Sequence, residues 1–243
     1  MNPKIQKDTV IIIMNKTIRY AFIKSLPVLF GYEFLGIAFG ILLQQAGFNP
    51  LWTFVCSLVV FAGSLQFVLV SFLSVTTPLP VVAAMSFLIN SRHMFYGLSF
   101  VEKFKSMGKR YPYMIFSLSD ETYSVLCSVK PEEGVDEKAA MFWIALMDQF
   151  YWVSGSVLGS VMGQLIPFDF TGIDFSMTAL FVVIFLEQWM DFKSHIPALT
   201  GLIISVIFLF LLGPDRFILP SLIVTVAVLM GLKKQILTQT GGL

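Results

Sequence analysis

The feature that most constrains this chain is a long stretch with almost no charge. Between residues 25 and 101 the only formally charged side chains are Glu33 and Arg92. Over all 243 residues only 13% are Asp, Glu, Lys or Arg, whereas soluble domains carry roughly 25%. A soluble fold so poor in charge would expose large apolar patches and aggregate. The sequence therefore predicts an integral membrane protein.

The apolar segments predict helices rather than strands. Every backbone polar group must be satisfied inside the lipid, which leaves helices of about 20 apolar residues or closed barrels. Barrel strands alternate polar and apolar residues, but runs such as 202–212 do not alternate. We therefore expect an all-α fold, a polytopic transmembrane helix bundle. The expected spans, bounded by prolines and glycines, are roughly 25–47, 52–75, 80–101, 139–165, 174–190, 196–213 and 217–232.

Lys and Arg residues predict the orientation, because cytoplasmic loops carry an excess of them. We expect residues 1–24 to form a cytoplasmic amphipathic lead-in, residues 25–236 a single transmembrane transport domain, and residues 237–243 a short C-terminal tail. Both termini are expected in the cytoplasm, with the chain multi-pass in the cytoplasmic membrane. Residues 102–110 are also basic, yet three full crossings would place them outside. We therefore expect at least one broken or re-entrant helix; the alternative is that segment 111–129 crosses the bilayer.

The few polar groups in the apolar spans are the candidate site. A polar group at membrane depth is costly unless it faces another polar group or water. We therefore expect these groups, with the glycines beside them, to line one substrate or ion pathway. The candidate pathway residues are Gly31, Glu33, Gly36, Gly63, Ser64, Gln66, Asn90, Arg92, His93, Tyr96, Asp120 and Glu121.

The first span combines a proline, several glycines and an acid. Pro27 and Gly31 weaken the helix, and Glu33 has no neighbouring counter-ion in the sequence. This combination suits a helix that is interrupted at a binding site, where its exposed ends hold charged groups. The alternative is a tightly packed helix, because Gly36 and Gly40 form a small-xxx-small pair.

Two further motifs keep a packing and a ligand interpretation open. Gly63, beside Ser64 and Gln66, either lets two helices approach closely or opens the backbone to a ligand. In the third span, Arg92 and His93 either face a polar partner at depth or lie near a membrane end with ordinary hydrogen bonds.

Asp120 and Glu121 place two carboxyl groups together in an apolar segment. A carboxyl group inside a membrane can carry a proton, as in pumps and transporters. The alternative is an ordinary helix start, with Ser117 or Ser119 as the capping residue. The two interpretations are compatible with each other.

The fourth long span repeats glycine at every fourth residue, at Gly155, Gly159 and Gly163. This spacing predicts close helix–helix packing. Asp148 shares the same helix face and is a possible partner for Arg92.

Motifs for nucleotide, metal and nucleophile chemistry are missing from the sequence. No phosphate loop, nucleophile elbow or metal-spaced His/Cys cluster occurs. The cysteines, Cys56 and Cys127, are expected to be apolar filler residues. We expect no enzyme activity, no cofactor, no metal and no nucleic-acid partner. Energy for transport would then come from an ion gradient, a substrate gradient or another subunit.

Short motifs follow one another through most of residues 25–232. They lie at 26–27, 31–32, 36–40, 61–67, 90–97, 118–122, 151–159 and 174–181. In number and order these motifs resemble the AzlC family of branched-chain amino-acid permeases. The resemblance implies a secondary transporter that exports valine, leucine and isoleucine, with methionine as a further candidate, together with a small AzlD-like membrane subunit. The alternatives are a non-transporting scaffold subunit and an intramembrane enzyme.

Overall fold

The protein is all-α in the part of the chain that the computed structural model describes, and this confirms the expected fold class. Its helices fall into two compact units: residues 1–78 with 86–176, and residues 79–85 with 177–243. The described residues are 3–74, 77–130, 133–165, 194–213 and 217–239, with isolated positions between 175 and 190.

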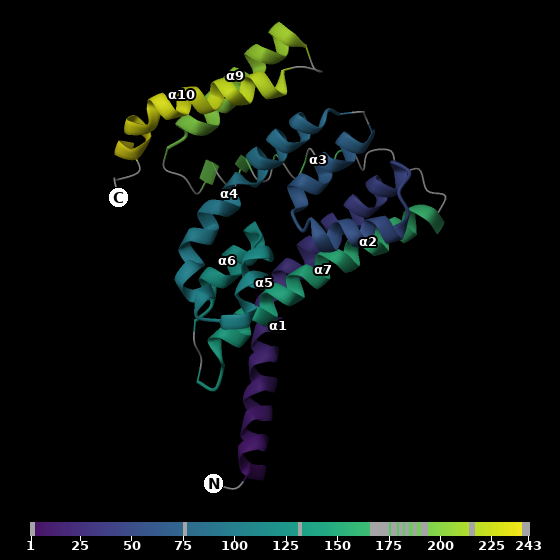
Figure 1. Cartoon of the computed structure of the whole chain (residues 1–243), viewed down its shortest axis with the longest axis vertical. Helices are drawn as coiled ribbons and strands as arrows, with labels where there is room; N and C mark the ends of the chain where they lie inside the picture. Colours follow the sequence, from purple (N-terminus) through teal and green to yellow (C-terminus); the bar gives the residue numbers. More distant parts are fainter. Residues whose placement is uncertain are drawn as a thin grey trace. The chain divides into compact units, whose positions relative to one another are not determined.

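The helices follow the expected spans closely, and Figure 1 shows their course. In chain order they are α1 (Pro3–Gln45), α2 (Pro50–Val59), α3 (Gly63–Ser74), α4 (Leu79–Lys105), the 3-10 helix η1 (Gly108–Arg110), α5 (Tyr111–Phe116), α6 (Asp120–Ser128), α7 (Glu137–Leu165), α9 (Ile196–Leu212) and α10 (Ile218–Gln239). Most of the expected span at 174–190 lies outside the described residues.

The lead-in and the first span form one helix, α1. The segment Ile13–Gln45, 33 residues, is long and apolar enough to cross a membrane. α1 continues through Pro27 and Gly31, so the interruption expected in the first span does not occur. The physical reason is tertiary. α1 packs extensively on α7, and this packing offsets the cost of an interior proline, about 3 kcal/mol, and of an interior glycine, about 1 kcal/mol.

The second expected span is broken into two short helices. α2 begins at Pro50, where the Asn49 side chain accepts hydrogen bonds of 3.1 Å from the N–H groups of Leu51 and Trp52. It ends at Val59, and α3 begins at Gly63. Residues 60–62 therefore form a break between α2 and α3.

Segment 111–129 is also broken. α5 ends at Phe116, and α6 begins at Asp120 behind the N-cap Ser119, whose hydroxyl accepts a 3.1 Å hydrogen bond from the N–H of Thr122. Residues 117–119 form the second break. The acids at the start of α6 suit the positive end of the helix dipole.

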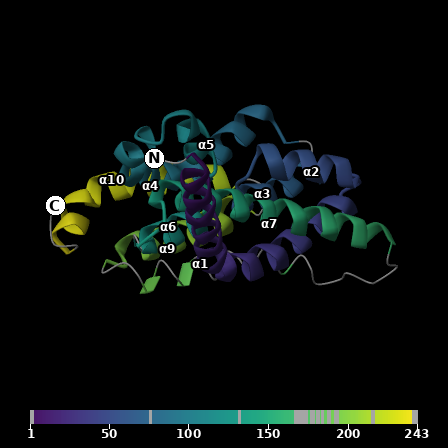
Figure 2. The same ribbon diagram turned by 90° about the horizontal axis from the view of Figure 1, so that it is seen from below.

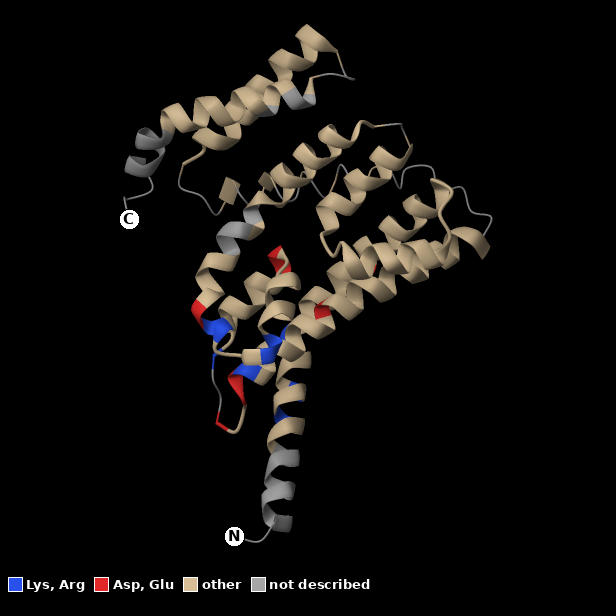
Figure 3. Ribbon diagram, viewed as in Figure 1, with Lys and Arg blue, Asp and Glu red and all other residues tan. Residues whose placement is uncertain are grey.

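Charged side chains gather at one end of the first unit, and Figure 3 shows the basic ones there. Lys103 pairs with Glu137, the Lys138 ammonium donates to the Ser106 carbonyl at 3.1 Å, and Lys16 donates to the Glu133 carbonyl. We call this region the charged end. The residues that form it come from α1, α4, η1, residues 133–136 and the start of α7.

The charged end fixes the course of the chain within the first unit. α4 runs towards it, and α7 leaves from it. Segment 111–129 starts there at η1 and returns there, because the Tyr20 hydroxyl donates to the Lys130 carbonyl at 3.0 Å. A buried apolar cluster from α1, α4, α5, α6 and α7 lies beneath this end and includes Phe104, Met114, Leu126 and Met141.

In the second unit, α9 and α10 pack against each other. At their contact a Cβ added to Gly201 would lie 3.9 Å from the Thr225 methyl carbon. Large apolar side chains face outward, among them Phe210, which is 85% exposed. An outer surface of this kind is expected where lipid or another membrane helix covers the protein.

Candidate functional site

The interface between α1 and α7 is the most extensive helix contact among the described residues of the first unit, and Figures 1 and 2 show the two helices side by side. A Cβ added to Gly159 would lie 2.1 Å from the Ile37 carbonyl oxygen. One added to Gly40 would lie 1.9 Å from the Ser156 carbonyl oxygen. Such distances leave no room for any side chain, so the two backbones touch directly.

The remaining glycines of this interface meet the opposite helix in the same way. A Cβ on Gly36 would be 3.0 Å from the Ser156 nitrogen, and one on Gly155 3.0 Å from the Glu33 Cα. A Cβ on Gly163 would be 2.9 Å from the Gln44 side-chain oxygen. The structure thus places Gly36, proposed from sequence as a pathway residue, at a packing contact.

Trp152 connects the α1–α7 interface with the start of α3. Its indole N–H donates a 2.7 Å hydrogen bond to the Gln66 side-chain oxygen. Its ring stacks on Phe39 with centroids 6.2 Å apart, and a Cβ on Gly63 would lie 3.2 Å from it. Trp152 and Gln66 are both buried. The small residue at the start of α3 therefore makes space for an aromatic ring.

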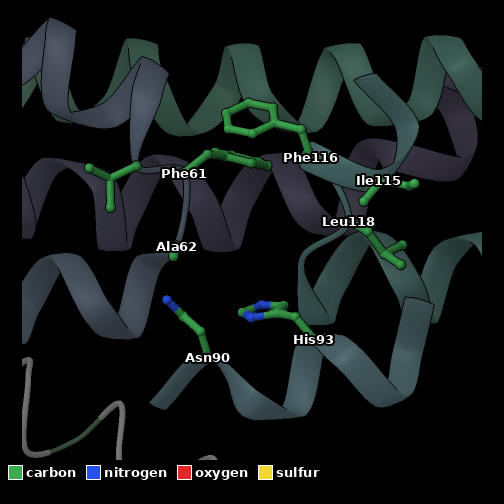
Figure 4. Close-up of a pocket in the computed structure, with 8 residues that line it drawn as sticks. Phe61, Ala62, Asn90, His93, Ile115, Phe116 and Leu118 are labelled. Carbon is green, nitrogen blue, oxygen red and sulfur yellow. The ribbon is translucent and has the colours of Figure 1, made fainter. Parts of the chain in front are cut away.

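A cavity of about 200 Å³ lies where the two helix breaks meet α4. The α2–α3 break contributes Val60, Phe61 and Ala62, and the α5–α6 segment contributes Ile115, Phe116 and Leu118. Asn90 and His93 of α4 supply the polar side chains, and Figure 4 shows both of them facing Ala62 and Phe61. Most of the lining side chains are thus apolar, and the polar side chains come from α4.

The two polar side chains of α4 form a polar wall of the cavity, and they differ in their partners. The side-chain oxygen of Asn90 is buried and has no hydrogen-bond partner among the described atoms. His93 Nε2 lies 3.9 Å from Asp120 Oδ1. The first-turn N–H groups of a helix lack intrahelical partners, and α3 begins immediately after Ala62, which lines the cavity. These groups make the wall suitable for a charged or polar ligand.

A hydrogen-bond chain through three hydroxyl groups lies beside the cavity. The Tyr32 hydroxyl is 2.8 Å from Glu121 Oε2 and 2.6 Å from the Ser119 hydroxyl. The Ser119 hydroxyl donates to Thr122 at 3.0 Å, and the Thr122 hydroxyl donates to Asp148 Oδ2 at 2.8 Å. We call Tyr32, Ser119 and Thr122 the hydroxyl chain. It joins α1, the start of α6 and α7.

Sequence reasoning did not select Tyr32 or Thr122, and it named Asp148 only as a partner for Arg92. Asp148 is completely buried and its described hydrogen-bond donor is Thr122. A signal was available: an acid in the middle of a glycine-spaced apolar span needs a partner. The partner expected was Arg92, whose side chain lies outside the described residues.

The structure brings several candidate pathway residues together and separates others. Asn90 and His93 line the cavity. Asp120 lies behind this wall, 3.9 Å from the His93 ring, and Glu121 accepts a hydrogen bond from Tyr32. Ser64 is buried in α3 next to Gly63 and Gln66.

Two candidates lie away from this group. Glu33 accepts a 2.7 Å hydrogen bond from Ser154 at the α1–α7 interface. Gly31 is exposed, with nothing within 4 Å of an added Cβ. The side chains of Arg92 and Tyr96 are outside the described residues.

Comparisons with known proteins match this sequence to one family. The sequence model of the family described as "AzlC protein" matches residues 27–166. That range contains both helix breaks, the cavity and most of the α1–α7 interface. No solved structure matches the chain.

Curated relatives extend the match over most of the chain. It is 40% identical over 217 residues to the branched-chain amino acid transport protein AzlC of Bacillus subtilis (strain 168), covering 89% of this chain and 85% of that protein. It is 38% identical over 221 residues to an uncharacterized membrane protein of Helicobacter pylori (strain ATCC 700392 / 26695), covering 91% and 97%. It is 27% identical over 178 residues to the inner membrane protein YgaZ of Escherichia coli (strain K12), covering 70% and 72%.

Proposed function

The chain belongs to the AzlC family and is a membrane transport protein, and from this premise we propose that it exports branched-chain amino acids across the cytoplasmic membrane. The substrates proposed are valine, leucine and isoleucine, with methionine as a further candidate. The observation that carries the proposal is the cavity between two helix breaks and α4, where most lining side chains are apolar and two are polar. Transporters bind substrate where discontinuous helices meet.

The size and polarity of the cavity suit a small amino acid. Drug-sized ligands occupy pockets of roughly 300–1,000 Å³, and this cavity is about 200 Å³. An aliphatic side chain would contact Phe61, Phe116 and Leu118. The two charged groups of the zwitterion would face the opposite wall.

The polar wall offers a partner for each charge of the substrate. The first turn of α3 and the His93 ring suit a carboxylate, because helix N-termini and imidazolium attract anions. The Asn90 side-chain oxygen and the Asp120 carboxylate suit an ammonium group. In this assignment Gly63 and Ser64 shape the start of α3.

We also propose that a small AzlD-like membrane subunit assembles with this chain. The support is the family resemblance together with the apolar outer surface of α9 and α10, which another membrane helix would cover. Exchange of leucine by the chain alone, at the rate of the two-subunit preparation, would contradict a requirement for the subunit in transport.

The charged end of the first unit is proposed to face the cytoplasm. Lys16, Lys103 and Lys138 meet there, and Lys and Arg favour that side of the membrane. A cysteine introduced at Ser106 should resist an impermeant thiol reagent in intact cells and react after the cells are opened. Ready labelling from outside would reverse the orientation.

The experiment that tests the function is transport by purified protein. The full chain is reconstituted in proteoliposomes with and without its small subunit, and release of radiolabelled leucine is followed. Competition by valine and isoleucine, and weak competition by a charged amino acid such as lysine, is the expected result. Absence of leucine movement in both preparations would favour the scaffold alternative, and chemical conversion of leucine would favour an enzyme.

A further inference from the structure

The hydroxyl chain connects two carboxyl groups in very different surroundings. Glu121, at its first end, is exposed in this chain. Asp148, at its other end, is 0% exposed. The four oxygen–oxygen distances along the chain, 2.8, 2.6, 3.0 and 2.8 Å, are all within hydrogen-bond range. A buried acid is thereby linked to the surface of the chain through the hydroxyl groups of Tyr32, Ser119 and Thr122.

Asp148 has fewer partners than an ionised carboxylate needs. Thr122 donates one hydrogen bond to Oδ2, whereas Oδ1 is buried and has no hydrogen-bond partner among the described atoms. None of the ion pairs formed by described side chains includes Asp148. A charge buried without a counter-ion carries a large desolvation cost. Binding a proton would remove that cost.

We propose that Asp148 is a proton-binding site, that the hydroxyl chain exchanges its proton with Glu121, and that this transfer couples proton movement to transport. The proposal rests on the transport function proposed above, because coupling requires a substrate to be moved. The ligand of this site is the proton. Helix packing alone does not explain why a carboxyl group is buried at position 148.

The hydrogen-bonded path permits transfer without any other reactant once Glu121 is protonated. Its carboxyl O–H then donates to the Tyr32 oxygen, in place of the hydrogen bond that the Tyr32 hydroxyl donates to Glu121 in this structure. Protonated Glu121 gives its proton to the Tyr32 oxygen while the Tyr32 proton passes to Ser119. The Ser119 proton passes to Thr122, and the Thr122 proton passes to Asp148. Each hydroxyl group breaks one O–H bond and forms another. The net change is one proton lost by Glu121 and one gained by Asp148.

No basic group is among the described titratable residues that interact electrostatically with Asp148. Those residues are Tyr32 of α1, Tyr113 of α5, Glu121 of α6 and Tyr151 of α7. α2, which also packs on α7, contains no charged residue. Three of these neighbours are phenols and the fourth is an acid. Two carboxyl groups that interact electrostatically favour a state in which one of them holds a proton.

The hydroxyl chain lies next to the proposed substrate cavity. Leu118, which lines the cavity, directly precedes Ser119. The Tyr32 ring contacts Phe61, another lining residue, with centroids 6.4 Å apart. A substrate that moves the α5–α6 break would therefore alter the contact between Ser119 and Tyr32. This adjacency provides a physical path from substrate binding to proton transfer.

The test separates proton movement from leucine movement in proteoliposomes of the full chain with its small subunit. A trapped pH-sensitive dye reports proton flux driven by a leucine gradient, and radiolabelled leucine reports exchange with no net gradient. Thr122→Val removes the hydroxyl group at similar size, and Thr122→Ser keeps it. Ser128→Ala is the matched control, because that hydroxyl of the same helix is exposed and bonds only the Val125 carbonyl.

We expect Thr122→Val to lower leucine-driven proton flux about tenfold or more, since a positioned proton-transfer group contributes at least that much. Leucine exchange should remain, because exchange moves no net proton. Thr122→Ser should restore the flux, Asp148→Asn should abolish it, and Ser128→Ala should match the unmodified protein. If Thr122→Val does not fold, Tyr32→Phe removes a different hydroxyl of the chain and must show the same separation.

An unchanged proton-to-leucine ratio in both Thr122→Val and Asp148→Asn would overturn the proposal. So would equal loss of both fluxes in Thr122→Val and Thr122→Ser, which would indicate a structural role. Infrared titration provides a readout that does not depend on transport. A protonated-carboxyl band that disappears in Asp148→Asn supports the site even if leucine is never exchanged, whereas its absence from the unmodified protein refutes it. Failure of exchange alone would refute only the transport function.

Discussion

The α1–α7 interface and the two helix breaks beside it differ in backbone structure: the helices are continuous at the interface and interrupted at the breaks. At the interface, two long uninterrupted helices meet through glycines, and the backbone of each touches the other. At residues 60–62 and 117–119 the helices stop, and the ends of short helices surround a cavity. The first arrangement leaves no space for a ligand, while the second creates one. The comparison favours a division in which the glycine contacts of α1 and α7 hold the two helices together and the broken segments form the cavity.

The largest effect on folding is expected from Gly159→Leu at the α1–α7 interface. An added Cβ alone would lie 2.1 Å from the Ile37 carbonyl oxygen, so leucine must force α1 and α7 apart. Overpacking usually costs about 1–3 kcal/mol, and contact with a backbone cannot be relieved by rotating a side chain. We expect little folded protein by size-exclusion chromatography in detergent.

The matched control for this prediction is Gly31→Ala on α1, where an added Cβ meets nothing within 4 Å. It should fold as the unmodified protein does. Normal folding of Gly159→Leu with only an altered substrate profile would indicate that the α1–α7 interface binds substrate.

The second largest effect is expected from Ala62→Trp, which fills the cavity at the α2–α3 break. Leucine exchange should be lost while the protein remains folded, because the indole occupies space that the α1–α7 interface does not need. Leu73→Trp, near the other end of α3 at a side chain that is 46% exposed, is the control. Full exchange by Ala62→Trp would place the substrate elsewhere.

The sequence predicted the all-α class and most helix positions because charge and hydropathy report them directly. It predicted a packing role for Gly159, and the geometry supplies the opposing contact, Ile37. It failed on the interruption at Pro27, since long-range packing on α7 decides whether one proline ends a helix. A local sequence pattern predicts structure well in long apolar segments, which all become helices in the membrane. It predicts poorly where contacts with distant segments decide the local conformation.

The site was harder to predict because its contacts join distant parts of the chain. Asp120 and Glu121 were recognisable as acids in an apolar segment. Tyr32 and Thr122 were not, since a tyrosine or threonine is common in any helix and gains its role only from its partners. The Tyr32 hydroxyl reaches Glu121 across 89 positions of sequence. No local spacing reports a hydrogen bond of that kind.

The connection between the two regions can be measured at Trp152 and Gln66. Trp152→Phe leaves the buried Gln66 oxygen without its donor, and Gln66→Leu leaves the indole N–H without its acceptor. Each should destabilise the protein by about 1–3 kcal/mol, and the double variant by less than the sum, since an unsatisfied buried group costs more than a bond contributes. Thermal unfolding in detergent measures the difference. Additive effects would indicate that the interface and the site are independent here.

The smallest effect is expected from Glu33→Gln, which asks whether this acid belongs to the helix packing or to the ion pathway. Glu33 is partly buried at the α1–α7 interface, where Ser154 donates a 2.7 Å hydrogen bond to its Oε1. Glutamine keeps an oxygen in that position, so stability should change by no more than about 0.5 kcal/mol. Leucine exchange and leucine-driven proton flux should both stay normal, because the hydroxyl chain reaches Asp148 from Glu121 without passing through Glu33. Ser154→Ala is the matched control, since it removes the same hydrogen bond from the other side and should be equally mild. Loss of proton flux in Glu33→Gln, with exchange intact and Ser154→Ala normal, would give Glu33 a role in the ion pathway. The α1–α7 interface would then take part in transport, as the two helix breaks are proposed to do.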